Sequence, residues 1–208
     1  QGNLSAACGI TSTHEKSMYE LLTHEAPLAE VVVAVDNLKV VPANIGLSAF
    51  EQLCTGEPDK EYQLKSALMN HGYDYVLIDC PPSLGLLTLN ALAAADEVYI
   101  PVQTEFLALQ GLSQLLDTCK VINRRINPAL KLGGIIGMRF NRRKLNSEII
   151  NHLRESFKDK MFNTAIRENI ALAEAPSFGM DIYRYKPTSI GAQDYKDLCK
   201  EIIQRTSL

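Results

Sequence analysis

One stretch of the sequence decides the fold: Tyr75-Val76-Leu77-Ile78-Asp79-Cys80-Pro81-Pro82-Ser83-Leu84-Gly85. Four aromatic or apolar residues end on a carboxylate, and two prolines follow. A short apolar run bounded in this way predicts a strand buried on both faces, as in a parallel sheet. The prolines lack N–H groups, so the strand must end before them. Asp79 is therefore predicted at the carboxyl end of a central strand, where open α/β sheets bind ligands.

Two roles for Asp79 follow from this placement. A carboxylate held rigidly at the end of a buried strand can reach a Mg²⁺ ion, usually through water, as a Walker B element does. Alternatively, the side chain starts a turn or caps the next helix. The strand pattern alone leaves both roles open.

The composition is that of an ordinary globular protein. The 208 residues are 46% hydrophobic and 22% charged, which suits one α/β domain over residues 1–208. No apolar run is long enough to span a membrane, and no signal peptide is evident. The five cysteines and four histidines are scattered without metal-ligand spacing. We therefore expect reduced thiols and a cytoplasmic protein.

Charge is distributed unevenly along the chain. Residues 1–117 hold 15 acidic and 4 basic residues, whereas residues 118–208 hold 9 acidic and 17 basic ones. Between Asp117 and Glu148 there are eight Lys or Arg residues and no acidic residue. This asymmetry indicates an anionic partner for the C-terminal half, or else a basic face that acidic neighbours balance in the fold.

The pattern along the chain predicts helices and strands in alternation. Ser12 and Glu15 form a possible capping box for a helix over 12–24, after a loop over 1–10. Further helices are expected over 44–54, 62–70, 85–95, 107–126, 147–157, 171–175 and 193–205. Strands are expected over 38–41, 75–79, 98–102, 132–140 and 161–166, and residues 28–35 are ambiguous. Alternation of this kind predicts a doubly wound, mainly parallel sheet flanked by helices.

The segment DCPPSLGLLTLNAL (79–92) closely resembles the Walker B and switch segment of the ParA/Soj family of partitioning ATPases. Further matches are IPVQTE (100–105), ALQGL (108–112), LAEAPSFG (172–179) and GAQDY (191–195). The resemblance covers essentially the whole chain and implies a P-loop NTPase-like fold. It strongly favours the Walker B role for Asp79, and it favours a short helix within 27–35.

A phosphate-binding P-loop is expected to lie outside these residues. The motif GxxxxGK[ST] cradles phosphates, but none of the 12 glycines is followed by Lys. Gln1-Gly2-Asn3 resembles the family segment Asp-Pro-Gln-Gly-Asn without its first two residues. We expect the chain to begin after the second strand of the fold, so that roughly 40 residues, the scale of one βαβ unit, precede it. As given, the chain is expected to bind ATP poorly or not at all.

For the intact protein, the resemblance implies a cycle driven by ATP and Mg²⁺. An ATP-bound homodimer would bind DNA without sequence preference on the nucleoid, and a ParB-like protein would stimulate hydrolysis. Asp79 would orient Mg²⁺, while Pro82 and Gly85 would belong to a switch that responds to the γ-phosphate. Asn141 lies where related folds contact adenine, although it can equally be a polar residue that ends a strand.

The resemblance also implies where DNA would bind. Family members place arginines after the strand that here ends at Phe140, which matches Arg142 and Arg143, with Lys144 next to them. A second arginine-bearing segment corresponds to residues 166–171. There the arginine is displaced by one position to Arg167, and Ala171 replaces a further arginine. Arg167, Arg184 or Lys186 is expected to substitute.

The sequence also allows two other classes of protein. MinD-like relatives bind membranes through a basic C-terminal helix, whereas the last helix here mixes acidic and basic residues, so no membrane partner is expected. A non-catalytic fragment or interaction module would explain the absence of a P-loop. The intact switch segment instead favours an ATPase.

Overall fold

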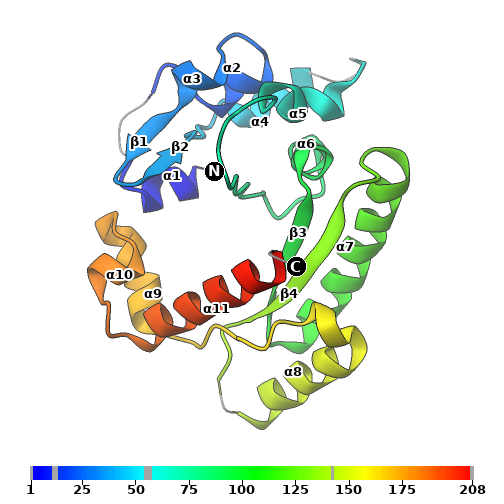
Figure 1. The fold of residues 1–208 in the computed structure, drawn as a ribbon, viewed down its shortest axis with the longest axis vertical. Helices are drawn as coiled ribbons and strands as arrows, with labels where there is room; N and C mark the ends of the chain where they lie inside the picture. The colour runs from blue at the N-terminus through cyan, green and yellow to red at the C-terminus, as the bar shows by residue number, and fades with distance from the viewer. Residues whose placement is uncertain (1, 11–13, 54–57, 142, 207–208) are drawn as a thin grey trace.

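The computed structural model describes residues 2–10, 14–53, 58–141 and 143–206 (Figure 1). Its strands are β1 (Val33–Val35), β2 (Leu38–Val40), β3 (Glu97–Gln103) and β4 (Lys131–Met138). The helices of the N-terminal part are α1 (Asn3–Ala7), α2 (Met18–Leu22), α3 (Leu28–Val31), α4 (Leu47–Leu53), η1 (Lys60–Tyr62), α5 (Gln63–Ala67) and α6 (Leu86–Ala94). Those that follow are α7 (Phe106–Arg125), α8 (Lys144–Phe157), η2 (Lys158–Lys160), α9 (Ile170–Glu174), η3 (Ala175–Phe178), α10 (Ile182–Tyr185) and α11 (Ile190–Thr206).

Strands β3 and β4 form a parallel pair at the centre of the molecule. Their register runs from Glu97 opposite Lys131 to Gln103 opposite Met138, with one irregularity after Val98. Gly134 allows close packing here, because a Cβ at this position would collide with the ring of Phe162. The predicted strands over 98–102 and 132–140 are thus confirmed.

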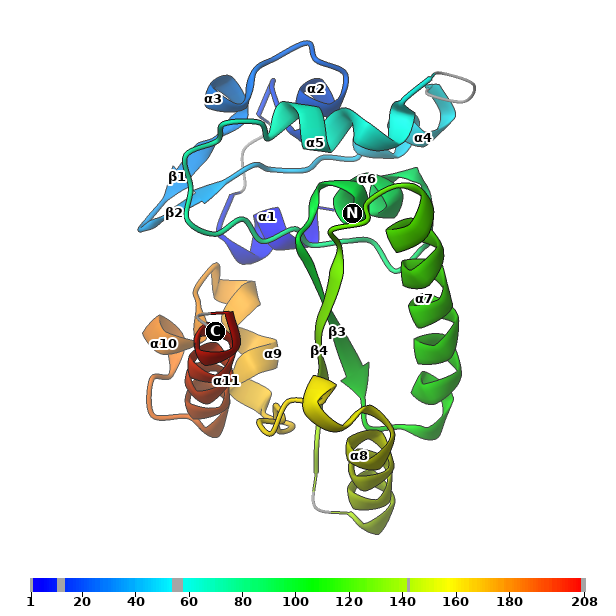
Figure 2. The same cartoon turned by 45° about the vertical axis from the view of Figure 1, so that its right-hand side comes forward.

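Helices cover both faces of this pair, with α7 on one side and α11 on the other in both views (Figures 1 and 2). Successive residues of β4 point to opposite faces. Ile135 packs with residues of α7 and α8, whereas Ile136 packs with Leu198 of α11. The expected doubly wound α/β fold is therefore confirmed.

A second hydrophobic core lies in the N-terminal part. Its largest buried members are Leu21, Leu22, Val31, Phe50 and Leu64.

Helix α2 is the expected helix of this region, but its start was predicted wrongly. Its capping box is formed by Ser17 and Glu20, five residues later than the Ser12–Glu15 pattern, and Ser12 itself lies outside the described residues. The later Ser-x-x-Glu directly precedes the apolar residues of this core.

Two further predictions for the N-terminal part need correction. Residues 1–10 were expected to be a loop, yet α1 forms within them. The ambiguous 28–35 segment is divided, because α3 is followed by β1, which pairs antiparallel with β2. The family-based expectation of a short helix is confirmed for Leu28–Val31 alone.

The predicted central strand over 75–79 is absent. Residues 71–81 have no regular secondary structure, and the Leu77 side chain is 91% exposed. A strand needs a neighbour to take its N–H and C=O groups. Within the described part of the chain, β3 and β4 pair with each other and no strand lies alongside 75–79. High β propensity without a partner leaves this segment irregular.

The strand predicted over 161–166 is reduced to a bridge between Met161 and Ile135 of β4, and a second bridge follows it between Arg167 and Phe140, which lies beyond the end of β4. The Phe162 N–H donates to Ile135 O at 2.9 Å, and the Ile166 N–H donates to Gly137 O at 2.8 Å. Between these two hydrogen bonds, this segment advances by four residues while β4 advances by only two. The amides of Asn163 and Thr164 leave the ladder and donate to the Glu201 carboxylate at 2.9 and 3.0 Å.

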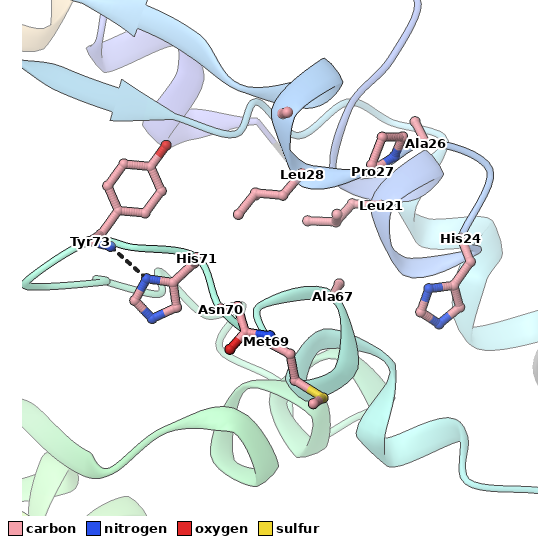
Figure 3. Close-up of a pocket in the computed structure, with 11 residues that line it drawn as sticks. Leu21, His24, Ala26, Pro27, Leu28, Ala67, Met69, Asn70, His71 and Tyr73 are labelled. Atoms are coloured by element: carbon pink, nitrogen blue, oxygen red, sulfur yellow. Dashed lines mark hydrogen bonds between the residues drawn. The ribbon is translucent and has the colours of Figure 1, made fainter.

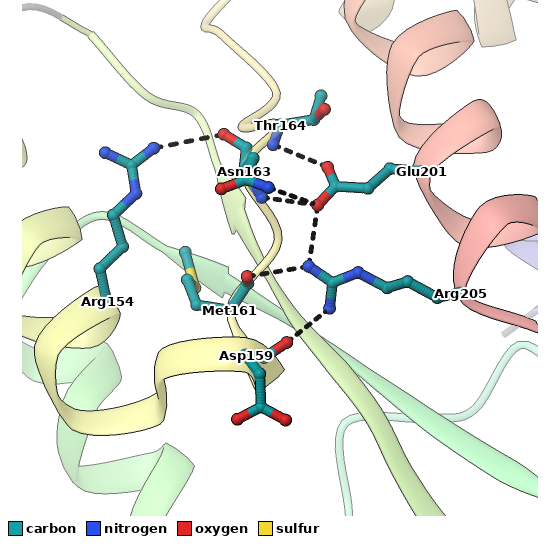
Figure 4. Close-up of polar contacts among 7 residues, drawn as sticks. All are labelled: Arg154, Asp159, Met161, Asn163, Thr164, Glu201 and Arg205. Atoms are coloured by element: carbon teal, nitrogen blue, oxygen red, sulfur yellow. Dashed lines mark hydrogen bonds and ion pairs between the residues drawn. The ribbon is translucent and has the colours of Figure 1, made fainter. Parts of the chain in front are cut away.

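Arg205 completes this polar cluster (Figure 4). Its guanidinium donates to Asp159 O at 2.9 Å, to Met161 O at 3.0 Å and to Glu201 at 2.8 Å. It also lies 4.0 Å from the centre of the Phe162 ring. The last two turns of α11 thus hold the 159–164 connection against the sheet. Burial alone would raise the pKa of Glu201, but these hydrogen bonds lower it below the usual 4.5.

We predict that Glu201→Ala lowers the free energy of unfolding by about 1–3 kcal/mol, because two amides lose their acceptor. Urea denaturation at neutral pH would measure this. Since the folded-state pKa of Glu201 is lowered, its contribution is complete above pH 4.5 and is lost as the pH falls through the folded-state value. The variant should therefore lose less stability than the wild type on acidification. Glu155→Ala on the exposed side of α8 is the matched control, and an equal loss there would contradict the assignment.

Candidate nucleic-acid interface

The carboxyl ends of β3 and β4 lie at the same edge of the pair, because the strands are parallel. Thr104 follows β3 and is 1% exposed. Its N–H donates to Met138 O at 3.2 Å, which keeps the two strand ends together. The Asn146 side-chain amide, in the first turn of α8, donates to Thr104 O and, at 2.8 Å, to Thr104 Oγ1.

The residue after β4, Arg139, has a backbone conformation that is unusual for a residue with a side chain. Its φ is +51°, in the left-handed region. Arg139 is passed over in the pairing with the next segment, since the Phe140 N–H, rather than that of Arg139, donates to Ile166 O at 3.0 Å. Such a bulge turns the chain and redirects the residues that follow. The Arg139 side chain pairs with Glu168 at 3.3 Å.

The turn between β4 and α8 brings together three of the predicted site residues. Asn141 Oδ1 accepts the Arg143 N–H at 3.2 Å, which shapes the start of α8. Lys144 is 93% exposed on its side chain and has a loose ion pair with Glu148 at 3.9 Å. Within the described residues, no carboxylate forms an ion pair with Arg143. Arg142 lies outside the described residues.

Arg167 lies beside this turn, since it bridges to Phe140, but its side chain is held by α11. Its backbone N–H donates to Asp194 Oδ2 at 2.9 Å, and its Nε–H donates to the same carboxylate at 3.0 Å. The Asp194 side chain is 7% exposed and that of Arg167 is 40% exposed. The hydrogen bond to Asp194 raises the pKa of Arg167, which keeps the guanidinium charged.

Arg184 is not brought to the same place. It lies on α10, apart from the β4–α8 turn in both views (Figures 1 and 2). Its guanidinium pairs with Asp181 at 2.6 Å and with Asp36, at the tip of the β1–β2 hairpin, at 2.6 Å. Two carboxylates thus compete with any phosphate for this arginine.

The switch residues lie on the connection that leads into α6. Asp79 and Pro82 are exposed, and Gly85 is the N-cap residue of α6. The Thr88 hydroxyl donates to Ser83 O at 2.6 Å, which ties the end of this connection to the helix. No cluster of three or more metal-ligating side chains occurs among the described residues. One carboxylate fits Mg²⁺ as a single ligand beside water and phosphate oxygens, rather than as part of an all-protein cage.

A pocket of about 600 Å³ lies away from these residues, between the α2–α3 turn and the segment after α5 (Figure 3). Leu21 and Leu28 point into it from one side, and Met69, His71 and Tyr73 border it from the other. His71 Nδ1 accepts the Tyr73 N–H at 2.9 Å. None of the predicted site residues lines this pocket.

In the described part of the chain, no helix has the length and apolar character needed to cross a membrane.

Comparisons with known proteins identify the family. Residues 1–132 match a family described as an AAA domain. The chain is 43% identical to the chromosome-partitioning ATPase Soj of Treponema pallidum over an alignment of 210 residues. This alignment covers 99% of this chain and 82% of the relative. Cobyrinic acid a,c-diamide synthase from Mycobacterium smegmatis, solved with ADP and magnesium, is 31% identical with a TM-score of 0.70, over 79% of this chain and 69% of that one.

A plasmid partition protein of Borrelia burgdorferi bound to AMPPNP has a TM-score of 0.82 over 99% of this chain and 83% of that one. At 21% identity, it shows the fold alone. The fold is that of the P-loop NTPases. Within that class, the chain belongs to the ParA/Soj family of chromosome-partitioning ATPases, as the sequence motifs predicted.

Sequence reasoning missed the residues that hold the site in place. Thr104 and Asp194 lie within the motifs IPVQTE and GAQDY, which were used to recognise the family but not to assign roles. Asn146 had no motif signal. It lies one residue before the helix predicted over 147–157, whereas the observed helix α8 begins at Lys144 and includes it.

We predict that Arg167→Ala destabilises the protein more than Asp194→Ala. Removal of the arginine leaves a buried carboxylate largely unpaired and should cost about 3–5 kcal/mol. Removal of Asp194 leaves a guanidinium that water already reaches in part, and the cost should be about 1–3 kcal/mol. Urea denaturation of both variants would test the order. Equal costs, or the reverse order, would contradict the buried role of Asp194.

Proposed function

We propose that this protein is a ParA-like partitioning ATPase that binds DNA without sequence preference in an ATP-bound dimer. Membership of the ParA/Soj family supports the ATPase and partitioning roles. The observation that carries the DNA interface is the β4–α8 turn, where Arg143 lacks a carboxylate partner among the described residues and Lys144 is almost fully exposed.

The chemistry of DNA backbone binding fits this turn. Lys and Arg neutralise phosphates without reading bases, and the affinity falls steeply with salt. The sequence between Asp117 and Glu148 contains eight Lys or Arg residues and no acidic residue, although Lys120, Arg139 and Lys144 pair with carboxylates outside this interval. Arg142 would add to the same surface. Arg167 and Arg184 would contribute less, because Asp194, Asp181 and Asp36 already hold them.

Nucleotide binding would place Mg²⁺ between Asp79 and the phosphates. The metal, when bound, neutralises charge on the phosphate oxygens. Asp79 would orient it through water, and the connection through Pro82 to Gly85 would follow the γ-phosphate, since it leads directly into α6. Asn141 would contact adenine at the carboxyl edge of β4. A ParB-like protein would stimulate hydrolysis, end the dimeric state and release the protein from the nucleoid.

We predict that Asp79→Ala abolishes ATP-dependent dimerisation of the protein as its own cell makes it, because Mg²⁺ would lose the carboxylate that orients it through water. Light scattering with a non-hydrolysable ATP analogue and Mg²⁺ would measure the dimer. Asp74→Ala is the matched control, since Asp74 is an exposed carboxylate in the same irregular segment and should be neutral. Unchanged dimerisation of the Asp79 variant would remove it from the metal site.

We predict that the double charge reversal Arg142→Glu/Arg143→Glu weakens DNA binding and reduces the slope of log K against log salt by about 0.9 for each lost phosphate contact. Fluorescence anisotropy on random-sequence duplex DNA would measure both. Lys131→Glu is the control, because this exposed lysine begins β4 at the opposite end of the strand. If the Lys131 variant lost as much affinity, net charge rather than the turn would control binding.

A further inference from the structure

The two ends of the β4–α8 turn are joined through one buried threonine. The Asn146 amide, at the helix end, donates to Thr104 O and to Thr104 Oγ1. The Thr104 hydroxyl in turn donates to Arg139 O, at the strand end, at 3.5 Å. Thr104 belongs to neither end of the turn, since it follows β3. The turn is thus closed by a relay that runs from Asn146 through Thr104 to Arg139.

The side chains of this relay are buried, which strengthens the hydrogen bonds between them. Thr104 is 1% exposed and Asn146 is 8% exposed, so water does not compete freely for their hydrogen bonds. A buried polar group that loses its partner is costly, and the hydrogen bonds of Asn146 to Thr104 therefore hold the start of α8 against the end of β3. Arg143 and Lys144, by contrast, are exposed cations that lie between its two ends.

The relay also holds a strained backbone. Arg139 has a φ of +51°, which few residues other than glycine adopt without support from their surroundings. Its carbonyl is the acceptor of the Thr104 hydroxyl, and its side chain is fixed by Glu168. Strain of this kind beside a binding turn is expected where the surrounding structure imposes a conformation that the turn would not keep alone.

We propose that Thr104 and Asn146 are positioning residues for DNA binding, which rests on the DNA-binding role proposed above. They touch no phosphate. They hold the β4–α8 turn in the conformation that presents Arg143 and Lys144 together, so that little conformational freedom is lost when DNA binds. A flexible turn with the same cations would bind more weakly while making the same contacts.

The chain offers a close control for this proposal. Asn127, after α7, is 4% exposed, and its side-chain amide donates to Leu92 O at 3.0 Å and to Ala95 O at 2.7 Å. It is thus a buried asparagine that also clamps backbone carbonyls, but it lies at the opposite end of the β3–β4 pair. Asn146→Ala and Asn127→Ala should therefore cause comparable losses of stability.

The test compares the two variants in the protein as its own cell makes it, with a non-hydrolysable ATP analogue and Mg²⁺, by anisotropy on random-sequence duplex DNA at several salt concentrations. We expect Asn146→Ala to weaken binding about tenfold with an unchanged salt slope, because the phosphate contacts remain and the ordering cost rises. Asn127→Ala should bind like the wild type. Equal affinities for the two variants, or a reduced slope for Asn146→Ala, would overturn the positioning role.

A second variant covers the case in which Asn146→Ala does not fold. Thr104→Val keeps the volume and the backbone acceptor but removes the hydroxyl that reaches Arg139 O, and it should show a smaller loss with the same unchanged slope. Wild-type affinity for Thr104→Val would then overturn the relay. If the wild type itself did not bind DNA, the proposed function would fail instead, which these measurements distinguish from failure of the relay.

Discussion

The parallel ladder of hydrogen bonds between β3 and β4 is the constraint on which the rest of the structure depends. Parallel pairing places the two carboxyl ends at one edge, so the chain leaves β3 and β4 side by side. That is why Thr104, after one strand, can close a turn that follows the other. Alternation along β4 sends Ile135 and Ile136 to opposite cores, which requires helices on both faces. Fold and candidate interface thus share one cause.

The same constraint explains the segments that do not become strands. Residues 75–79 have the β-branched and aromatic character of a buried strand, but within the described residues no neighbouring strand pairs with them. In the 161–166 segment, Glu201 accepts hydrogen bonds from two consecutive amides, those of Asn163 and Thr164, whose N–H groups would point to opposite sides in a continuous strand. Propensity selects candidates for strands, whereas hydrogen-bond partners decide among them.

Local sequence patterns correctly predicted the helices and strands that depend mainly on neighbouring residues. The helix expected over 107–126 is α7, and the strands expected over 98–102 and 132–140 are β3 and β4, because periodicity and flanking breakers are properties of neighbouring residues. The family resemblance directed attention to Asn141, Arg143 and Lys144, which do share one turn. Ion pairs between residues far apart in the sequence could not be predicted from these patterns. Asp194 is 27 residues from Arg167, and no pattern in the sequence links Arg184 with Asp36.

Charge composition is a poor guide to an interface until the ion pairs are known. The C-terminal half is strongly basic, yet Arg139, Arg167, Arg184 and Arg205 each face a carboxylate within the fold. Those arginines join segments that are distant in the sequence, and a phosphate would have to displace a partner to reach them. Arg143 has no such competitor among the described residues. The proposed DNA interface therefore depends on which cations lack a carboxylate partner among the described residues, rather than on the total charge of the half that carries them.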